Sequence, residues 1–281
     1  MSLSKRGLLA YVTINSWTGQ RQDARAQRSV ATEFKTTSDV GRYKKSLLPG
    51  AAELNSVHNA AGRLRKFFHY RTLPWLSDGT RIVSSIGYIE FTREFKKLQA
   101  EFDTAVSEFC TAYPSLKAQA EQKLGDLFDV SEYPDVATLK SCFQCTLSVM
   151  PLPDVADFRT EVSDAERADF LKSISAVETQ ATQDCFRRLH TVITKAIDTL
   201  SKPDAKFKDT LIDNIRECCE LLPKLNVTDS AELDQAVQST NQALANVSAD
   251  ACREDSKARQ STADALKAIE SLMANAMGRA Q

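Results

Sequence analysis

The chain has 281 residues, of which 42% are hydrophobic and 26% are charged, which is typical of a globular protein and excludes a disordered or fibrous one. Its 9 glycines and 8 prolines are few, so we expect long elements, chiefly helices. The formal net charge is -1, but the charges are unevenly spread: up to Arg71 the chain carries 13 lysines and arginines against 4 acids, and after it 23 against 33. This imbalance has two interpretations, namely surfaces of opposite sign that attract each other within the fold or across an oligomer, and a basic face for nucleic acid.

The seven cysteines are odd in number and scattered, which predicts reduced thiols and a cytoplasmic protein. The apolar run from Gly7 to Ile14 lacks the small-residue cleavage site of a signal peptide, and we do not expect it to act as one. No stretch approaches the length of a membrane span, so no membrane partner is expected.

The first 83 residues predict a mixture of strands and helices. The run from Leu8 to Asn15 is typical of a strand, and a turn follows it at Ser16 to Gly19. Gln20 to Phe34 is polar and rich in arginine, as in an exposed helix or a mobile arm. Ala51 to Tyr70 predicts an amphipathic helix.

A hairpin is expected next, with arms at Leu73 to Leu76 and at Thr80 to Val83 and a turn at Ser77, Asp78 and Gly79. Pro74 would hold its first arm at a sheet edge, because proline cannot donate to the hydrogen-bond ladder.

The middle of the chain predicts a helix with an aromatic stripe from Tyr88 to Tyr113, ended by Pro114. A shorter helix follows and stops at Gly125. After a helical piece from Pro134 to Leu139, the run from Cys142 to Met150 predicts a strand that pairs with the first strand in an antiparallel sheet.

The last part of the chain predicts long helices. Ser163 to Leu200 has helical periodicity throughout and opens with a capping box between Ser163 and Glu166. A second helix runs from Pro203 to Leu222 and ends at Pro223, and a second capping box begins at Asp229. The stretch from Ser248 to Asp264 has almost no large apolar residue, so it is either a helix that projects into solvent or a break near Ser248.

These elements predict an α+β protein that is predominantly α-helical, with a small antiparallel N-terminal sheet and long antiparallel helices in a coiled-coil-like hairpin. We expect two domains, an α+β region over residues 1–153 and a long-helix region over residues 154–281.

No motif indicates catalysis. Cys142 and Cys145 are three residues apart, but no second pair at similar spacing completes a zinc site, so buried thiols are expected. The three histidines, His58, His69 and His190, form no metal-binding pair and adjoin no evident nucleophile. We therefore expect neither a catalytic residue nor a metal or other cofactor, and predict that the chain is not an enzyme.

At the end of the helix predicted from Ala51 to Tyr70, basic side chains are interleaved with aromatic ones. Such a pattern suits single-stranded nucleic acid, because cations bind phosphates and rings stack on bases. The alternative is a basic helix end docked on the acidic C-terminal region. The candidate nucleic-acid-binding residues are Arg63, Arg65, Lys66, Phe67, Tyr70 and Arg71.

The weakly apolar end of the last predicted helix is a candidate contact surface for a partner or for self-association. Its residues are Leu266, Ile269, Leu272 and Met273.

The run Ile14-Asn15-Ser16-Trp17-Thr18-Gly19-Gln20-Arg21 resembles an uncharacterised family of bacteriophage and prophage proteins, in which a strand enters a similar turn before a mostly helical body. The likeness extends loosely through residues 72–75, Gly79 and the helix that begins near Phe91, and reaches as far as residues 157–159. Trp17, Thr18, Gly19 and Arg21 match the motif, as a structural turn or as a functional one.

Members of that family are encoded beside a MoxR-type AAA+ ATPase and a von Willebrand factor A-type protein. The resemblance implies an adaptor that partners an AAA+ ATPase, and it carries over no catalytic residue.

Two functions follow from the sequence. The first is a non-enzymatic, phage-type helical interaction or adaptor protein that partners an AAA+ ATPase or self-assembles as a homo-oligomer. The alternative is a single-stranded DNA- or RNA-binding protein of phage replication, recombination or host takeover. The alternative requires the basic side chains of the first quarter to converge on one face, namely Arg25, Arg28, Arg42, Lys44, Lys45, Arg63, Arg65 and Lys66.

Overall fold

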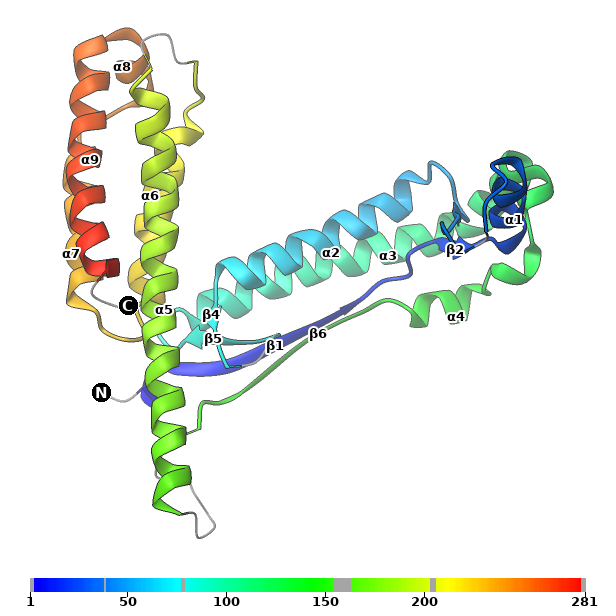
Figure 1. The fold of residues 1–281 in the computed structure, drawn as a ribbon, viewed down its shortest axis with the longest axis horizontal. Helices are drawn as coiled ribbons and strands as arrows, with labels where there is room; N and C mark the ends of the chain where they lie inside the picture. The colour runs from blue at the N-terminus through cyan, green and yellow to red at the C-terminus, as the bar shows by residue number, and fades with distance from the viewer. Residues whose placement is uncertain (1–2, 38, 77–78, 154–162, 203–205, 279–281) are drawn as a thin grey trace. The chain divides into compact units, whose positions relative to one another are not determined.

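The computed structural model describes residues 3–37, 39–76, 79–153, 163–202 and 206–278 (Figure 1). The chain folds as two compact units. Unit 1 is formed by Met1–Tyr11, His69–Phe91 and Ser148–Gln281, and unit 2 by Val12–Phe68 and Thr92–Leu147. Each unit therefore combines segments that are distant in sequence. The two expected domains, by contrast, are each one continuous stretch of the chain, divided after residue 153. That division stays a prediction.

The four-stranded antiparallel sheet has the strand order β4-β5-β1-β6. β1 (Gly7–Asn15) pairs with β5 (Thr80–Ser84), with Gly7 opposite Ser84 and Tyr11 opposite Thr80. β4 (Leu73–Pro74) lies at one edge, as Pro74 predicts, and β6 (Gln144–Pro151) lies at the other. The expected first strand, the hairpin and the pairing of the first strand with the strand after Cys142 are confirmed. Ser77 and Asp78 of the expected turn lie outside the described residues.

The helices of unit 1 pack around the long helix α5 (Asp164–Leu200), which contacts α6 (Thr210–Leu225), α7 (Ala231–Leu244) and α9 (Ser256–Gly278). Figure 1 shows these helices as a bundle. The predicted capping box is confirmed: the Glu166 amide donates to Ser163 Oγ at 3.3 Å, and the Ser163 amide donates to Glu166 Oε2 at 2.8 Å. The buried apolar faces of these helices form one continuous core. The fold is thus α+β and mainly helical, as expected.

Two expected helix ends are wrong, because each proline lies inside a helix. α3 (Tyr88–Leu124) continues through Pro114, and α6 continues through Pro223. Proline disfavours a helix interior because it lacks the N–H and crowds the preceding turn. In α3 the buried residues Tyr113 and Ala120 lie before and after the proline, so tertiary packing holds both sides.

The remaining helix boundaries of unit 1 also differ in detail from expectation. α6 begins at Thr210, and Pro203 of the expected start lies outside the described residues. Ser230, one residue later than expected, caps α7 by accepting from the Leu233 amide. Of the two alternatives for Ser248 to Asp264, the structure has the break near Ser248: Ser248 caps the short α8 (Ala249–Glu254), and α9 follows it.

Unit 2 contains the greater parts of α2 (Ala52–Tyr70) and α3, together with α1 (Ala24–Glu33) and α4 (Val136–Ser141). A separate two-stranded sheet is formed by β2 (Gln20–Gln22) and β3 (Lys44–Ser46). Leu64 of α2 and Phe102 and Phe109 of α3 are fully buried in this unit, which confirms the expected apolar stripes. Short 3-10 turns at Leu3–Lys5, Gly125–Leu127 and Val130–Glu132 complete the described elements. Among the described residues, no helix is both long enough and apolar enough to cross a bilayer.

Candidate functional site

Unit 2 carries a helix that is anchored at its base and exposed along its length. The segment Gln20 to Phe34, expected as an exposed helix or a mobile arm, forms β2 and α1. Asp23 caps α1, because its side chain accepts from the amides of Arg25 at 2.9 Å and Ala26 at 3.0 Å. The same carboxylate lies 2.9 Å from the ammonium nitrogen of Lys45. The Asp23 pKa is lowered to about 2 by the Ala26 amide first and by Lys45 second.

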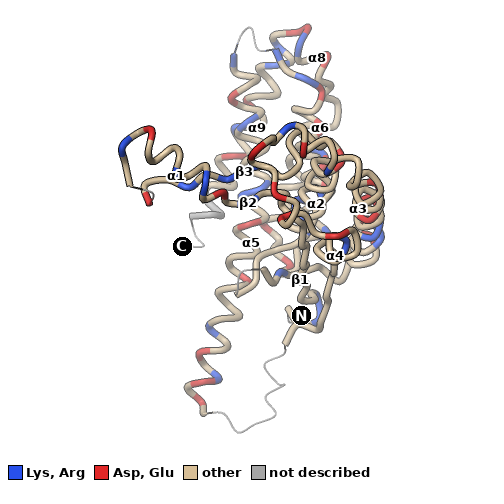
Figure 2. Tube along the Cα trace, turned by 90° about the vertical axis from the view of Figure 1, so that its right-hand side faces the viewer, with Lys and Arg blue, Asp and Glu red and all other residues tan. Residues whose placement is uncertain are grey.

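The small β2–β3 sheet closes the base of this helix. Arg21 lies opposite Lys45 in the antiparallel register. The Asp23 amide donates to the Tyr43 carbonyl at 3.0 Å, and the Leu47 amide donates to the Gly19 carbonyl at 2.7 Å, so the ladder extends beyond both strands. The segment that contains α1 therefore begins and ends at hydrogen-bonded strands, β2 and β3. In Figure 2, α1 stands out to the side of α2 and α3 and carries several basic residues.

Almost no side chain in the segment from α1 to β3 is buried. Ala31 is the buried residue of α1, whereas Phe34 and Val40 are each 72% exposed and Val30 and Tyr43 are also exposed. A ten-residue helix is marginal by itself in water, since most helical stability comes from packing an apolar face. We define the α1 surface as these exposed apolar and basic side chains: Arg25, Arg28, Val30, Phe34, Val40, Arg42, Tyr43 and Lys44.

The expected nucleic-acid-binding cluster is divided between the two units. In unit 2, Arg63 pairs with Glu101 at 3.0 Å, and Arg65 donates to the Ile14 carbonyl at 2.8 Å, while Lys66 is exposed and Phe67 half-buried. These two arginines already have protein partners.

In unit 1, the C-terminal end of α2 is held by side chains of the same unit. Arg71 pairs with Glu90 at 2.7 Å, and the Tyr70 carbonyl accepts from Arg188 of α5. Part of the basic helix end is thus docked within unit 1, but the acid that pairs with Arg71 comes from α3 and not from the C-terminal region.

The candidate contact surface on the last helix needs correction. Leu266, Ile269 and Met273 are buried in the core of unit 1, because α9 packs this face on α5, and a buried side chain cannot contact a partner. Leu272 is 62% exposed and points away from that core. The pattern was that of an ordinary core-facing stripe.

The motif turn has a structural explanation in unit 2. The ring centroid of Trp17 lies 6.1 Å from that of Phe109 and 6.1 Å from that of Tyr113. Gly19 has a φ of +64°, and a β-carbon there would lie 2.7 Å from Leu54 Cδ2. Only a residue without a side chain fits both conditions. Thr18 is exposed, and Arg21 is exposed on β2.

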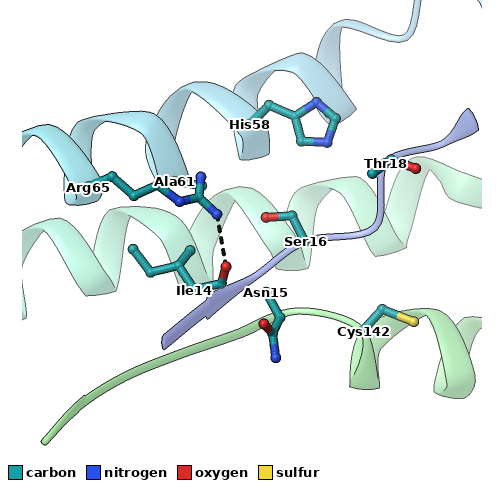
Figure 3. Close-up of a pocket in the computed structure, with 8 residues that line it drawn as sticks. All are labelled: Ile14, Asn15, Ser16, Thr18, His58, Ala61, Arg65 and Cys142. Carbon is teal, nitrogen blue, oxygen red and sulfur yellow. Dashed lines mark hydrogen bonds between the residues drawn. The ribbon is translucent and has the colours of Figure 1, made fainter. Parts of the chain in front are cut away.

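A surface pocket of about 460 Å³ lies beside this turn, between the end of β1, α2 and Cys142 at the end of α4 (Figure 3). Ser16, Thr18, His58 and Arg65 contribute polar groups to its wall. The sequence patterns gave no reason to place Ser16 or His58 at a site, because the residues of the pocket are brought together from three separate segments.

The cysteines are free thiols, and Cys142 and Cys145 occupy different elements, α4's C-cap and β6. Burial raises the pKa of Cys145 to about 11, so its reactive thiolate form is disfavoured. No group of three histidine, cysteine or acidic side chains within the described ranges is arranged to hold a metal ion.

Comparison of the chain with models of known families, with curated proteins and with solved structures gave no match.

Proposed function

We propose that the chain is a non-enzymatic interaction protein that binds another protein through the α1 surface. The exposure of Val30 and Phe34 on the anchored helix and its C-cap, together with that of Val40 in the segment after it, carries this proposal. Grouped exposed apolar side chains mark interaction sites, and burying them on a partner would supply the packing that α1 lacks alone.

The basic side chains of the α1 surface indicate the kind of partner. Arg25 and Arg28 of α1, and Arg42 and Lys44 after it, are exposed beside the apolar residues. An acidic protein surface with apolar side chains at its centre complements this arrangement, since charged rims steer association and apolar centres stabilise it. A second copy of this chain is one such partner, because the part of the chain after Arg71 carries a net negative charge. A MoxR-type AAA+ ATPase is the partner that the phage-family resemblance implies, with the adaptor acting in the host cytoplasm.

The test is a pair of neutral substitutions, Val30→Ser and Phe34→Ser, made together. Self-association is measured by light scattering coupled to size exclusion, and ATPase binding by co-elution with a purified MoxR-type ATPase. We expect the wild type to form at least one of these complexes and the double variant to lose it. A matched control is Leu272→Ser, which removes an exposed apolar side chain outside the α1 surface.

A second candidate function is single-stranded nucleic-acid binding, favoured by the exposed Phe34 and Tyr43 among the four cations of the α1 surface. Two observations count against it as the first choice. Lys45, one of the cations required on a common basic face, is buried in ion pairs, and Glu33 and Asp39 place negative charge in the same exposed segment.

Charge reversal separates the two functions. If single-stranded DNA is the ligand, Arg28→Glu, Arg42→Glu and Lys44→Glu together abolish its binding at low salt, whereas Val30→Ser with Phe34→Ser weakens it less. Arg63→Glu with Lys66→Glu is the control on α2. Absence of DNA binding by the wild type removes this candidate.

A further inference from the structure

The pocket beside the Trp17 turn holds its basic groups in fixed positions. The Arg65 guanidinium donates to the Ile14 carbonyl at 2.8 Å, which is drawn in Figure 3. His58 Nε2 lies 3.0 Å from the Trp17 carbonyl, so this nitrogen carries the proton and donates. A carbonyl can only accept, so the second ring nitrogen, Nδ1, is left for another partner. Both side chains belong to α2 and are held against the strand end.

Between these two groups lies a hydroxyl without a partner. Ser16 Oγ is buried and makes no hydrogen bond within the described structure. In Figure 3 its hydroxyl points into the space between Arg65 and His58. A buried hydroxyl without a partner is destabilising, so such a group calls for a specific explanation.

The chemistry of the lining selects the ligand. Arg65 uses one of its nitrogens on Ile14, and a guanidinium has five N–H donors in all. Ser16 adds a hydroxyl, whereas the Asn15 amide already donates to Gln144, and no acidic side chain is among the residues that line the described pocket. A cation beside a hydroxyl donor, with no acidic neighbour in the lining, favours an anion with several acceptor oxygens, and planar guanidinium groups bind phosphate especially well.

We infer that this pocket binds the phosphate group of a phosphate monoester, with Arg65 and the Ser16 hydroxyl as its donors. The Arg65 guanidinium binds the phosphate oxygens through N–H groups that do not reach Ile14. Ser16 donates its hydroxyl proton to the same group, which gives the buried oxygen its missing partner. The volume of about 460 Å³ leaves room for part of the esterified group as well as the phosphate.

The test uses inorganic phosphate and phenyl phosphate as probes, with binding to the full chain measured by isothermal titration calorimetry. We expect Arg65→Gln to weaken phenyl phosphate binding by tenfold or more. Ser16→Ala should weaken it by about fivefold, the equivalent of one hydrogen bond. Ser16→Ala removes no hydrogen bond within the protein, so it remains informative even if Arg65→Gln impairs folding.

Arg63→Gln is the matched control, because Arg63 is an exposed arginine on the same helix, pairs with Glu101 and does not line the pocket. Its affinity for phenyl phosphate should equal that of the wild type. The proposal is overturned if the wild type binds neither probe at millimolar concentration, or if Arg65→Gln and Ser16→Ala bind as tightly as Arg63→Gln.

A second pair of probes identifies the source of the phosphate. An oligonucleotide with a 5′-phosphate is compared with the same oligonucleotide without it. If the pocket binds nucleic-acid ends, the 5′-phosphate raises affinity and Arg65→Gln cancels the increase. If it binds free phosphate esters, phenyl phosphate binds while the 5′-phosphate adds nothing. Each result supports a phosphate site, and neither depends on the α1 surface.

Discussion

The ammonium nitrogen of Lys45 lies 2.9 Å from a carboxylate oxygen of Asp23, and the two side chains are only 2% and 5% exposed. Lys45 also lies 2.8 Å from Glu132 Oε2 and donates to the Leu127 carbonyl at 2.5 Å. This buried lysine thus joins the cap of α1 to the segment after α3. The α1 surface is presented on a fixed base for this reason.

Replacing Lys45 by methionine should weaken the anchoring of α1 to the rest of unit 2. The substitution keeps the length of the side chain but leaves the carboxylates of Asp23 and Glu132 without their cation, and an unpaired buried charge is strongly destabilising. We expect a clearly lower midpoint of urea unfolding and faster amide exchange in α1. Lys44→Met, at the exposed neighbouring position, is the control. Equal midpoints for the two variants would show that the buried pair contributes nothing.

The anchoring of α1 should weaken in acid. The pKa of Asp23 is lowered from 3.8 to about 2, so the folded state binds the proton less readily than the unfolded chain. The stabilisation is therefore complete above the unfolded value and is lost as the pH falls from about 4 to about 2. The protection of the α1 amides, expressed relative to the intrinsic exchange rate at each pH, should fall over this range in the wild type. In Asp23→Asn, which still caps the helix, the change over the same range should be smaller; an identical profile would exclude Asp23 as its cause.

Arg188 should stabilise unit 1 by binding the end of α2. Its guanidinium donates to the carbonyls of His69, Tyr70 and Thr72, and Asp184 pairs with it at 2.7 Å. Arg188→Ala would leave these acceptors without their donor, at a cost of about 3 kcal/mol in the free energy of unfolding. Chemical denaturation measures the change. Arg187→Ala, at an exposed position on the same helix, should change the free energy of unfolding little, and a similar loss in both variants would refute the assigned role.

Replacing Gly19 or Gly62 by alanine should change the stability of the protein in opposite directions. Gly19→Ala is expected to destabilise unit 2 by about 1–2 kcal/mol because of its positive φ, with a further cost from contact with Leu54. Gly62 lies within α2, and a β-carbon there would meet nothing within 4 Å. Gly62→Ala should therefore stabilise the helix by about 0.5–1 kcal/mol. Thermal unfolding of the two variants distinguishes the signs, and a stabilising Gly19→Ala would contradict the structural role of the turn.

The sequence predicted best where the signal was local. The capping box of Ser163 and Glu166 and the edge position of Pro74 each depend on a few neighbouring residues, and both are present. Pro114 was misjudged because burial on both sides outweighs a local preference. Leu266, Ile269 and Met273 formed a clear stripe, but periodicity cannot tell whether a stripe faces the protein's own core or a partner.

The candidate sites were harder to predict because they depend on long-range contacts. Lys45 meets Glu132 from a position far away in sequence, so its burial has no local signal, whereas the nucleic-acid-binding alternative requires Lys45 on a common basic face. The pocket likewise joins Ser16, His58 and Arg65 from separate elements. The exposure of α1 was partly foreseeable, since the polar, arginine-rich segment from Gln20 to Phe34 predicted an exposed helix as one of two alternatives.

The most direct test of the proposed function is light scattering coupled to size exclusion, applied to the wild type and to the variant with Val30→Ser and Phe34→Ser, each alone and with a MoxR-type ATPase. We predict a self-assembled or ATPase-bound wild type, and a double variant that elutes as a folded monomer under the same conditions. A wild type that remains monomeric and ignores the ATPase, or a double variant that assembles as the wild type does, would contradict the claim that the α1 surface binds a protein partner.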